Sequence, residues 1–210
     1  MEKIAVAVLV SGGGTNLQAI LDAERRGEMP YAEVKTVISS RPDAYALERA
    51  KKAGVAAVVA ERKKCASREE FEDKIVAAID EAGAEIIVLA GFMSILSERF
   101  TSRYAGRILN VHPSLIPKFC GEGFYGLKVH EAVLAAGEKV TGATVHYVNE
   151  IPDGGDIIFQ KEVEVKEGDT PEILQRRVME EAEWKLLPLA VEKVAEKFLA
   201  ARGAALSEER

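Results

Sequence analysis

The chain has 210 residues, of which 48% are hydrophobic, and a formal net charge of −6 from 34 acidic and 28 basic side chains. This length and apolar content allow one large domain with its own core, and the acidic balance argues against a broad nucleic-acid surface. Two cysteines do not suggest a disulfide framework and no apolar run reaches the ~18 residues of a membrane span, so we expect a reduced, cytoplasmic protein.

Strand and helix signals alternate through the first half of the chain. An apolar run at residues 4–10 predicts a strand, and the helix after it would turn Leu17, Ile20 and Leu21 to one face. Further strands are predicted, in chain order, at 34–38, 55–59, 86–89 and directly before Asn110. Helices are predicted between them at 44–53 and around Phe71, Ile75 and Ile79. Because these strands are apolar throughout, we expect both of their faces to be covered, as in a mostly parallel sheet flanked by helices.

The second half of the chain has a different pattern. Residues 129–136 predict a helix, whereas 141–148 and 157–165 alternate like half-exposed strands that extend the sheet in antiparallel or mixed fashion. A further helix begins at Thr170 and runs past Trp184, and Pro188 is expected to kink or interrupt it.

No repeat, linker or composition shift divides the sequence. We therefore predict one α/β domain over residues 1–210, built on a single doubly wound, mostly parallel sheet flanked by helices. The tail at 203–210 is expected to fray.

Two polar side chains end the strand that precedes Pro113. Asn110 and His112 are two residues apart, and alternation along a strand turns them to the same face. An amide and an imidazole on one face can stabilise an oxyanion and move a proton, which is acyl-transfer chemistry. Asp153, on a glycine-rich loop, is a candidate for orienting His112 and keeping it protonated, although an Asp before Gly154 is also common in plain turns.

Three glycines, Gly12 to Gly14, follow the first predicted strand. Backbone amides in such a loop, together with the helix N-terminus after it, can bind a phosphate. The pattern is neither a Walker loop nor a complete dinucleotide fingerprint, because Leu17 stands where the third glycine belongs. A tight turn without a ligand is the alternative.

The remaining histidines have simpler interpretations. His130 has polar neighbours in its predicted helix and is expected at the surface. His146 alternates along a strand and is expected in the core or, less often, in the lining of a site. No spacing of His and Cys suggests a metal site, so no metal is expected.

The motifs together resemble a known family, the folate-dependent phosphoribosylglycinamide formyltransferases. The resemblance runs from about residue 3 to about residue 190, and its motifs are Ser11 to Ile20, Leu89 to Leu96, Asn110 to Pro117 and Asp153 to Gly155. It implies a Rossmann-like formyltransferase fold and transfer of a formyl group from 10-formyltetrahydrofolate, the co-substrate, to the glycyl amine of glycinamide ribonucleotide in purine synthesis. The expected partners are these small molecules, with neither nucleic acid nor membrane, in a monomer or homodimer.

The resemblance also assigns site residues by position. It implies that Asn110, His112 and Asp153 are catalytic, that residues 1–106 form a phosphate-binding half, and that 107–200 form a catalytic and folate-binding half. The residues implied to bind the ribonucleotide are Gly14, Thr15, Asn16, Glu180 and Glu183. Those implied to bind the folate are Arg68, Met93, Ser94, Ile95, Leu96, Asn110, Asn149, Glu150, Ile151, Pro152 and Asp153. Ser94, Glu180 and Trp184 depart from common family residues, and three glycines within 119–126 suggest a mobile loop over the site.

Three rival functions remain open. A methionyl-tRNA formyltransferase would share the Asn110 and His112 motif, but a C-terminal RNA-binding domain and a basic surface would be expected with it. An NADP oxidoreductase would use Ser39, Ser40 and Arg41 for a 2′-phosphate, but the third glycine is missing. A non-catalytic phosphometabolite-binding protein would keep the glycine loop and have no need of the catalytic residues.

Overall fold

The computed structural model describes residues 3–208, and the chain forms two compact units. Unit 1 contains residues up to Ile95 together with those from Pro188 onward, and unit 2 contains Leu96 to Leu187. The sequence places the division of the chain near residue 106, whereas the units divide at Leu96 and the C-terminal residues return to unit 1. The units are described separately.

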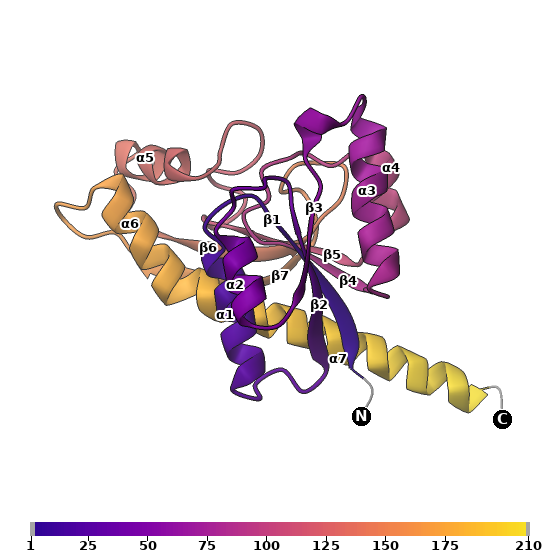
Figure 1. Ribbon diagram of the computed structural model, residues 1–210. Helices are drawn as coiled ribbons and strands as arrows, with labels where there is room; N and C mark the ends of the chain where they lie inside the picture. The colour runs from indigo at the N-terminus through magenta and orange to yellow at the C-terminus, as the bar shows by residue number, and fades with distance from the viewer. Residues whose placement is uncertain (1–2, 209–210) are drawn as a thin grey trace. The chain divides into compact units, whose positions relative to one another are not determined.

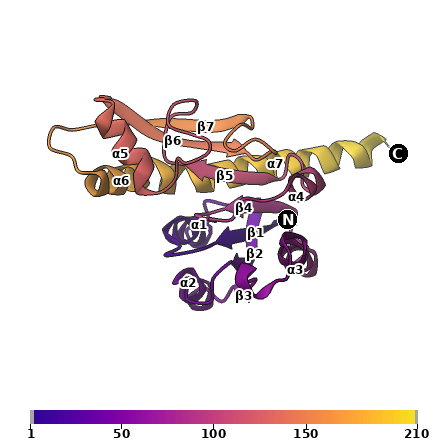
Figure 2. The ribbon, with the colours of Figure 1, turned by 90° about the horizontal axis from the view of Figure 1, so that it is seen from above.

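Unit 1 has the βα alternation that the sequence predicts (Figure 1). Its elements are β1 (Ile4–Val10), α1 (Thr15–Arg25), β2 (Ala32–Ser39), α2 (Ala46–Lys52), β3 (Ala56–Val59), a 3-10 turn η1 (Arg62–Lys64), α3 (Arg68–Glu81) and β4 (Ile86–Leu89). The strands are parallel and follow the order β3-β2-β1-β4. Helices α1 and α2 cover one face of this sheet and α3 covers the other, as Figure 2 shows, so the doubly wound α/β prediction is confirmed.

Burial explains why these helices lie against the sheet. Phe71, Ile75 and Ile79 recur at helical spacing on α3 and are fully buried, which is worth roughly 1.5–3 kcal/mol for each side chain. Ser67 begins α3 by accepting a hydrogen bond from the amide of Glu70 at 3.1 Å. Strands β1, β2 and β4 are almost entirely buried, as expected from their apolar runs.

Strand β3 departs from that expectation. It forms one edge of the sheet and pairs with β2, and all four of its side chains are exposed, including Val58 and Val59. The apolar run at 55–59 therefore predicted a strand correctly, but the expectation that both faces of this strand are covered was wrong. The composition of a strand does not determine whether it lies at the edge of the sheet.

Unit 2 contains α4 (Glu98–Arg103), β5 (Ile108–His112), α5 (Leu127–Ala135), β6 (Val140–Tyr147), β7 (Ile157–Glu164), α6 (Pro171–Val178) and a π-helix η2 (Met179–Glu183), followed by the first turn of α7 (Trp184–Glu208). Strand β6 pairs antiparallel with both β5 and β7, so the antiparallel extension predicted for the second half is confirmed. Thr170 accepts a hydrogen bond from the amide of Ile173, and Pro171 opens α6, as predicted.

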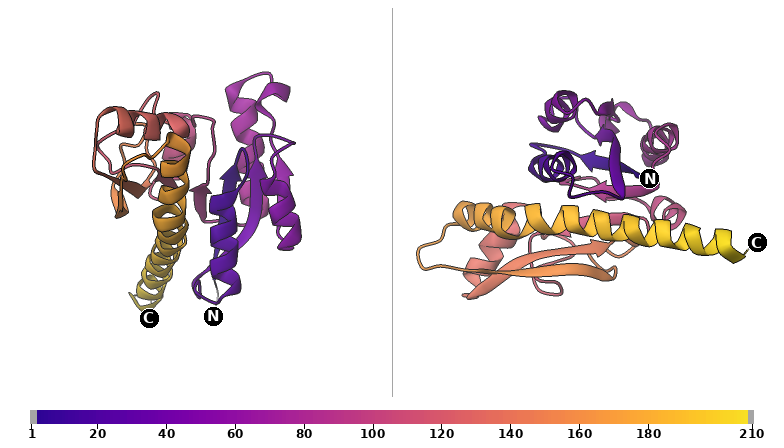
Figure 3. Two further views of the ribbon diagram at one scale, coloured as in Figure 1. Left: turned by 90° about the vertical axis from the view of Figure 1, so that its left-hand side faces the viewer. Right: turned by 90° about the horizontal axis from the view of Figure 1, so that it is seen from below.

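Two expectations for the C-terminal helices are corrected. Pro188 lies inside α7, which continues through it without interruption; Figure 3 shows α7 as one continuous coil. A proline inside a helix costs about 3 kcal/mol, but the flanking apolar face, including Leu187, Ala190 and Val191, is buried and outweighs that cost. The irregular turn occurs earlier, at η2. Residues 203–208, where fraying is expected, are helical, and Arg202, just before them, forms an ion pair with Glu85. Residues 209–210 of the expected tail lie outside the described residues.

Two further elements carry corrections. Helix α4 is too short for its periodicity to stand out in the sequence, and it was not predicted, although Ser97 caps it. His130, expected at the surface, is wholly buried because α5 turns it inward with Val129 and Val133. Among the described helices, none combines the length and the apolarity that crossing a membrane requires.

Candidate active site

Strand β5 delivers the two candidate catalytic side chains of unit 2, and the loop after β6 delivers the third. The Asp153 carboxylate lies 3.5 Å from Nδ1 of His112 and accepts a hydrogen bond from Nδ2 of Asn110 at 3.4 Å. His112 is buried and Asn110 is half-buried. The structure therefore brings together the three residues that the sequence singles out.

A fourth member of this cluster is His146, for which the sequence favours a core position and has the lining of a site as the lesser alternative. It lies directly opposite Asn110 in the pairing of β5 with β6 and is 1% exposed. Its Nδ1 donates to the carbonyl of Tyr147 at 2.7 Å, and its Nε2 lies 3.2 Å from Nδ2 of Asn110 and 3.4 Å from Oδ1 of Asp153. The sequence signal was the alternation of Thr144 and His146 along β6, but the strand register that places His146 beside Asn110 comes from the structure.

The charge of Asp153 is set by opposing effects. Burial raises the pKa of its carboxyl, but the hydrogen bond from His146, the charge of His112 and the amide of Gly121 together lower it below the usual value. The Gly121 amide donates at 2.9 Å. Asp153 is therefore ionised at neutral pH and faces both histidines as a carboxylate.

The loop that carries Asp153 is tightly constrained. Asp153 itself has a left-handed φ of 55°. A side chain at Gly155 would place its Cβ 1.8 Å from the carbonyl oxygen of Tyr147, so glycine is required there. The side-chain oxygen of Asn149 accepts from the amide of Ile151 at 3.0 Å and closes the turn before it. Such constraints fix the direction of the Asp153 carboxylate.

The segment after β5 covers His112. Nε2 of His112 donates to the carbonyl of Phe119 at 2.8 Å, so both ring nitrogens of His112 face oxygen atoms. The turn leading to Phe119 is held by buried hydroxyls: Ser114 donates to the carbonyl of Lys118 at 2.7 Å, and Thr144 donates to the carbonyl of Ser114 at 2.6 Å. This arrangement suits a doubly protonated imidazole, which donates on both sides.

The candidate phosphate loop lies in unit 1, between β1 and α1. Gly14 is the residue before α1 and has a φ of +70°, and its Cβ position would lie 2.6 Å from Cβ of Ala46. Thr15 begins α1 and Asn16 is buried in its first turn. The loop is thus pressed against α2, and a side chain at position 14 would not fit.

The candidate folate residues of unit 1 form an exposed apolar surface after β4. Met93 and Ile95 are 60% and 72% exposed, and Ser94 between them is half-buried. The amide of Met93 donates to Oγ of Ser11 at 2.9 Å. Arg68 donates to the carbonyl of Ile95 at 2.7 Å and pairs with Glu72 at 3.3 Å, so it holds this segment in place.

The other assigned residues lie in unit 2. Glu183 is buried in η2, which packs against β6, whereas Glu180 is exposed and accepts a hydrogen bond from Arg176 at 2.7 Å. Leu96 is half-buried, and Glu150, Ile151 and Pro152 are exposed on the Asp153 loop. The hydrogen bonds of unit 2 do not join Glu180 to the catalytic cluster. Within the described chain, no group of three or more His, Cys, Asp or Glu side chains has an arrangement able to hold a metal ion.

The residues that an NADP site would need have other partners. Arg41 makes two hydrogen bonds to Asp43, at 3.0 and 2.7 Å. Oγ of Ser40 lies 2.6 Å from Oγ of Ser11, and Ser39 donates to the carbonyl of Arg41 at 2.7 Å. A 2′-phosphate would have to displace these contacts, which argues against the oxidoreductase hypothesis.

Comparison with known proteins agrees with this geometry. Residues 4–191 match the model of the formyl transferase family. The phosphoribosylglycinamide formyltransferase of Haemophilus influenzae is 43% identical over 191 residues, which are 91% of this chain and 86% of that protein. The trifunctional purine biosynthetic protein adenosine-3 of Gallus gallus is 44% identical over 193 residues, 92% of this chain but 18% of that protein, so this chain spans less than a fifth of its length.

A solved structure is also similar over nearly the whole chain. Glycinamide ribonucleotide transformylase 1 from Symbiobacterium toebii has 42% sequence identity and a TM-score of 0.87, covering 93% of this chain and 89% of its own. This likeness confirms the Rossmann-like α/β fold class predicted from the sequence.

Proposed function

Because the chain belongs to the formyl transferase family, in the branch of the phosphoribosylglycinamide formyltransferases, we propose that it transfers the formyl group of 10-formyltetrahydrofolate to the amine of glycinamide ribonucleotide. The observation that carries the proposal is the Asp153 carboxylate, 3.5 Å from His112 and 3.4 Å from Asn110 in one cluster. A binding protein has no need of this arrangement, whereas acyl transfer does. We place the reaction in purine biosynthesis and the protein in the cytoplasm.

Asn110 supplies the first catalytic contact. Its Nδ2 donates to Asp153 at 3.4 Å, longer than the preferred length of about 2.9–3.0 Å, and lies 3.2 Å from Nε2 of His146, which faces the same carboxylate. A formyl oxygen that gains negative charge is a stronger acceptor, so Asn110 would turn one N–H to it as the amine attacks the formyl carbon. His146 and Asp153 keep the amide aimed in the right direction.

His112 supplies the proton. As an imidazolium it would stabilise the same oxyanion and donate a proton to the departing folate nitrogen. For this, the hydrogen bond from Nε2 of His112 to the carbonyl of Phe119 must be replaced by a hydrogen bond to the substrate. Asp153, which stays a carboxylate, compensates the positive charge of His112 and can steer a water that relays the proton released by the attacking amine to His112 after His112 has protonated the leaving nitrogen. No covalent intermediate with the protein is required.

Each substrate has a candidate binding region. Gly14, Thr15 and Asn16 would bind the phosphate of the ribonucleotide at the N-terminus of α1, with Glu183 and Glu180 toward its glycinamide end. The exposed apolar side chains of Met93 and Ile95 suit a flat aromatic ring such as a pterin. The residues that we propose to bind the folate, besides Asn110 and Asp153, are Arg68, Met93, Ser94, Ile95, Leu96, Asn149, Glu150, Ile151 and Pro152.

A direct assay tests this function. Purified protein is mixed with 10-formyltetrahydrofolate and glycinamide ribonucleotide, and absorbance follows the deformylated folate. Turnover should require both substrates and should fall by at least about 10² in Asn110→Ala and His112→Ala. Deformylation without the ribonucleotide would indicate a hydrolase or another acceptor, and the absence of any folate chemistry would overturn the proposal.

A further inference from the structure

Helix α2 places Arg49 directly behind the glycine loop. Its Nε donates to the carbonyl of Gly13 at 2.7 Å, and its Nη1 donates to Oε1 of Gln18 on α1 at 2.9 Å. Its guanidinium carbon lies 5.1 Å from the centre of the Tyr45 ring. We propose that Arg49 is a positioning residue that orients the glycine loop so that its amides face the phosphate of the substrate. The inference rests on the proposed function, of which the phosphate site is a part.

The three glycine carbonyls are all held on the protein side of the loop. The carbonyl of Gly12 accepts from the amide of Ala46 at 3.1 Å, that of Gly13 from Arg49, and that of Gly14 from the amide of Gln18 at 2.9 Å. In a planar trans peptide, the N–H of the next residue points opposite to the carbonyl. The amides of Gly13, Gly14 and Thr15 are therefore turned away from the protein, as an anion site requires.

Of these three carbonyls, only that of Gly13 depends on a side chain. The other two are fixed by backbone amides, which no substitution except proline removes. If the Gly13 carbonyl lost Arg49, its peptide could rotate and take the Gly14 N–H away from the ligand. The loop has little freedom to compensate by shifting, because Gly14 already lies against Ala46.

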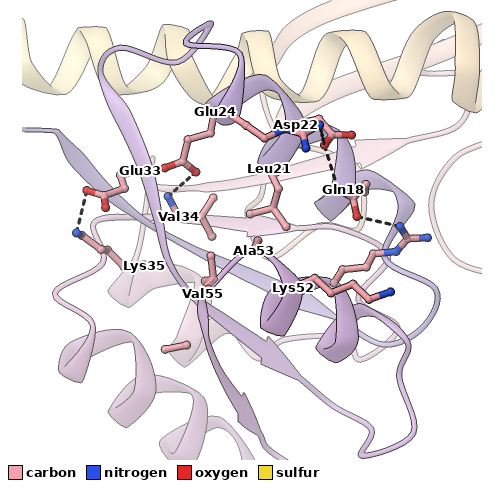
Figure 4. A pocket seen from close by; sticks show the side chains of 14 residues that line it. Gln18, Leu21, Asp22, Glu24, Glu33, Val34, Lys35, Lys52, Ala53 and Val55 are labelled. Carbon is pink, nitrogen blue, oxygen red and sulfur yellow. Dashed lines mark hydrogen bonds and ion pairs between the residues drawn. The ribbon is translucent and has the colours of Figure 1, made fainter.

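The shape of the guanidinium matters as well as its charge. Nε and Nη1 reach two different acceptors, Gly13 and Gln18, and a lysine has one nitrogen for both. Gln18 is itself held, since its Nε2 donates to Asp22 at 3.1 Å, which leaves its oxygen for Arg49. Figure 4 shows Gln18 and Asp22 on the wall of a cavity of about 700 Å³, which Arg49 also lines.

The test compares Arg49→Lys and Arg49→Met with Lys52→Met as a matched control. Lys52 lies on the same helix and also stacks on Tyr45, with Nζ 5.7 Å from the ring centre, but contacts neither Gly13 nor Gln18. We expect both Arg49 variants to raise the KM for glycinamide ribonucleotide about tenfold, with kcat and the KM for the folate nearly unchanged. Lys52→Met should behave as the unchanged protein.

A second measurement needs no turnover. Inorganic phosphate is titrated while NMR follows the amide resonances of Gly13 and Gly14. The unchanged protein and Lys52→Met should show saturable shifts, and both Arg49 variants should require about ten times more phosphate.

Four results would overturn the inference. The first is a normal KM for glycinamide ribonucleotide in Arg49→Lys beside a raised one in Arg49→Met, which would mean direct charge recognition, and the second is an unchanged KM in both variants. The third is an equal rise in the KM values for both substrates with a lower melting temperature, which would mean a general loss of structure. The fourth is that phosphate causes no amide shifts in the unchanged protein. Failure of the proposed function is distinguishable from these, because it would remove formyl transfer while leaving the phosphate titration and its dependence on Arg49 intact.

Discussion

Replacing Asp153 by Asn removes one charge from the catalytic cluster and leaves its shape almost unchanged. Asn tolerates the left-handed φ of 55° at this position, and its side-chain oxygen can still accept the 2.9 Å hydrogen bond from the amide of Gly121. The variant should therefore fold, so that a loss of activity reports the missing charge and the lost acceptor for Asn110 rather than a damaged loop.

The size of the effect follows from the distance between the two charges. At the 3.5 Å between Nδ1 of His112 and Oδ2 of Asp153, two unit charges attract by about 5 kcal/mol at an effective dielectric constant of about 20. If about half of this is lost from the stabilisation of a protonated His112 in the transition state, kcat falls roughly a hundredfold. The KM values should change much less, because the charge acts on the reacting atoms.

The assay is steady-state formyl transfer at neutral pH, with Asp156→Asn as the control. Asp156 is an exposed carboxylate on the same loop, and its backbone carbonyl, which accepts from the amide of Tyr147 at 2.9 Å, survives the substitution. Asp156→Asn should keep full activity. A kcat within threefold of normal for a folded Asp153→Asn would refute the assignment of a charge-compensating role to Asp153.

Three further outcomes are expected. Arg177→Met should lower the free energy of unfolding by about 2–3 kcal/mol in urea titrations, because it breaks a bidentate, mostly buried ion pair with Asp169. Arg176→Met, which breaks an exposed ion pair with Glu180, should lower it far less. Gly14→Ala should greatly raise the KM for the ribonucleotide, because its Cβ would lie 2.6 Å from that of Ala46; an unchanged KM would contradict the tight loop. Burial, followed by the charge of His112, lowers the pKa of His130 to about 4, so the unfolded state binds more protons between pH 6.5 and 4 and stability should fall by about 3 kcal/mol as pH drops through that window. In His130→Gln, the melting temperature should fall less between pH 6.5 and 4 than in the unchanged protein. An equally steep fall would exclude His130 as the cause of the pH dependence.

Local patterns in the sequence were sufficient to predict most of the elements and to single out the three candidate catalytic side chains. Alternation along a strand placed Asn110 and His112 on one face, and the structure has both within 3.5 Å of the Asp153 carboxylate. The coverage of β3 and the place of His146 depend instead on which strands are neighbours and in what register. Those properties arise from contacts between distant segments, so a single sequence does not determine them by periodicity.

The error at His130 has a local cause and was avoidable. Polar residues next to it in the sequence suggested a surface position, but neighbours in sequence lie on different faces of a helix. Its position three residues before the buried Val133 places it on the buried face of α5. The roles of Glu180 and Glu183 came only from the family resemblance and stay predictions, since neither position has a local pattern that indicates substrate contact.

The π-helix at Met179–Glu183 makes this part of the chain sensitive to its length. Its hydrogen-bonded ring contains one residue more than that of an α-helix, i→i+5 in place of i→i+4. Removing one residue from it would allow an ordinary α-helix to pass straight from α6 to α7. Because the wide turn takes up the extra residue, the side chains of α6 and α7 would keep nearly their present directions relative to each other. The change would be confined to the turn itself, where the buried Glu183 lies, so spacing, as much as residue identity, sets the direction of its carboxylate.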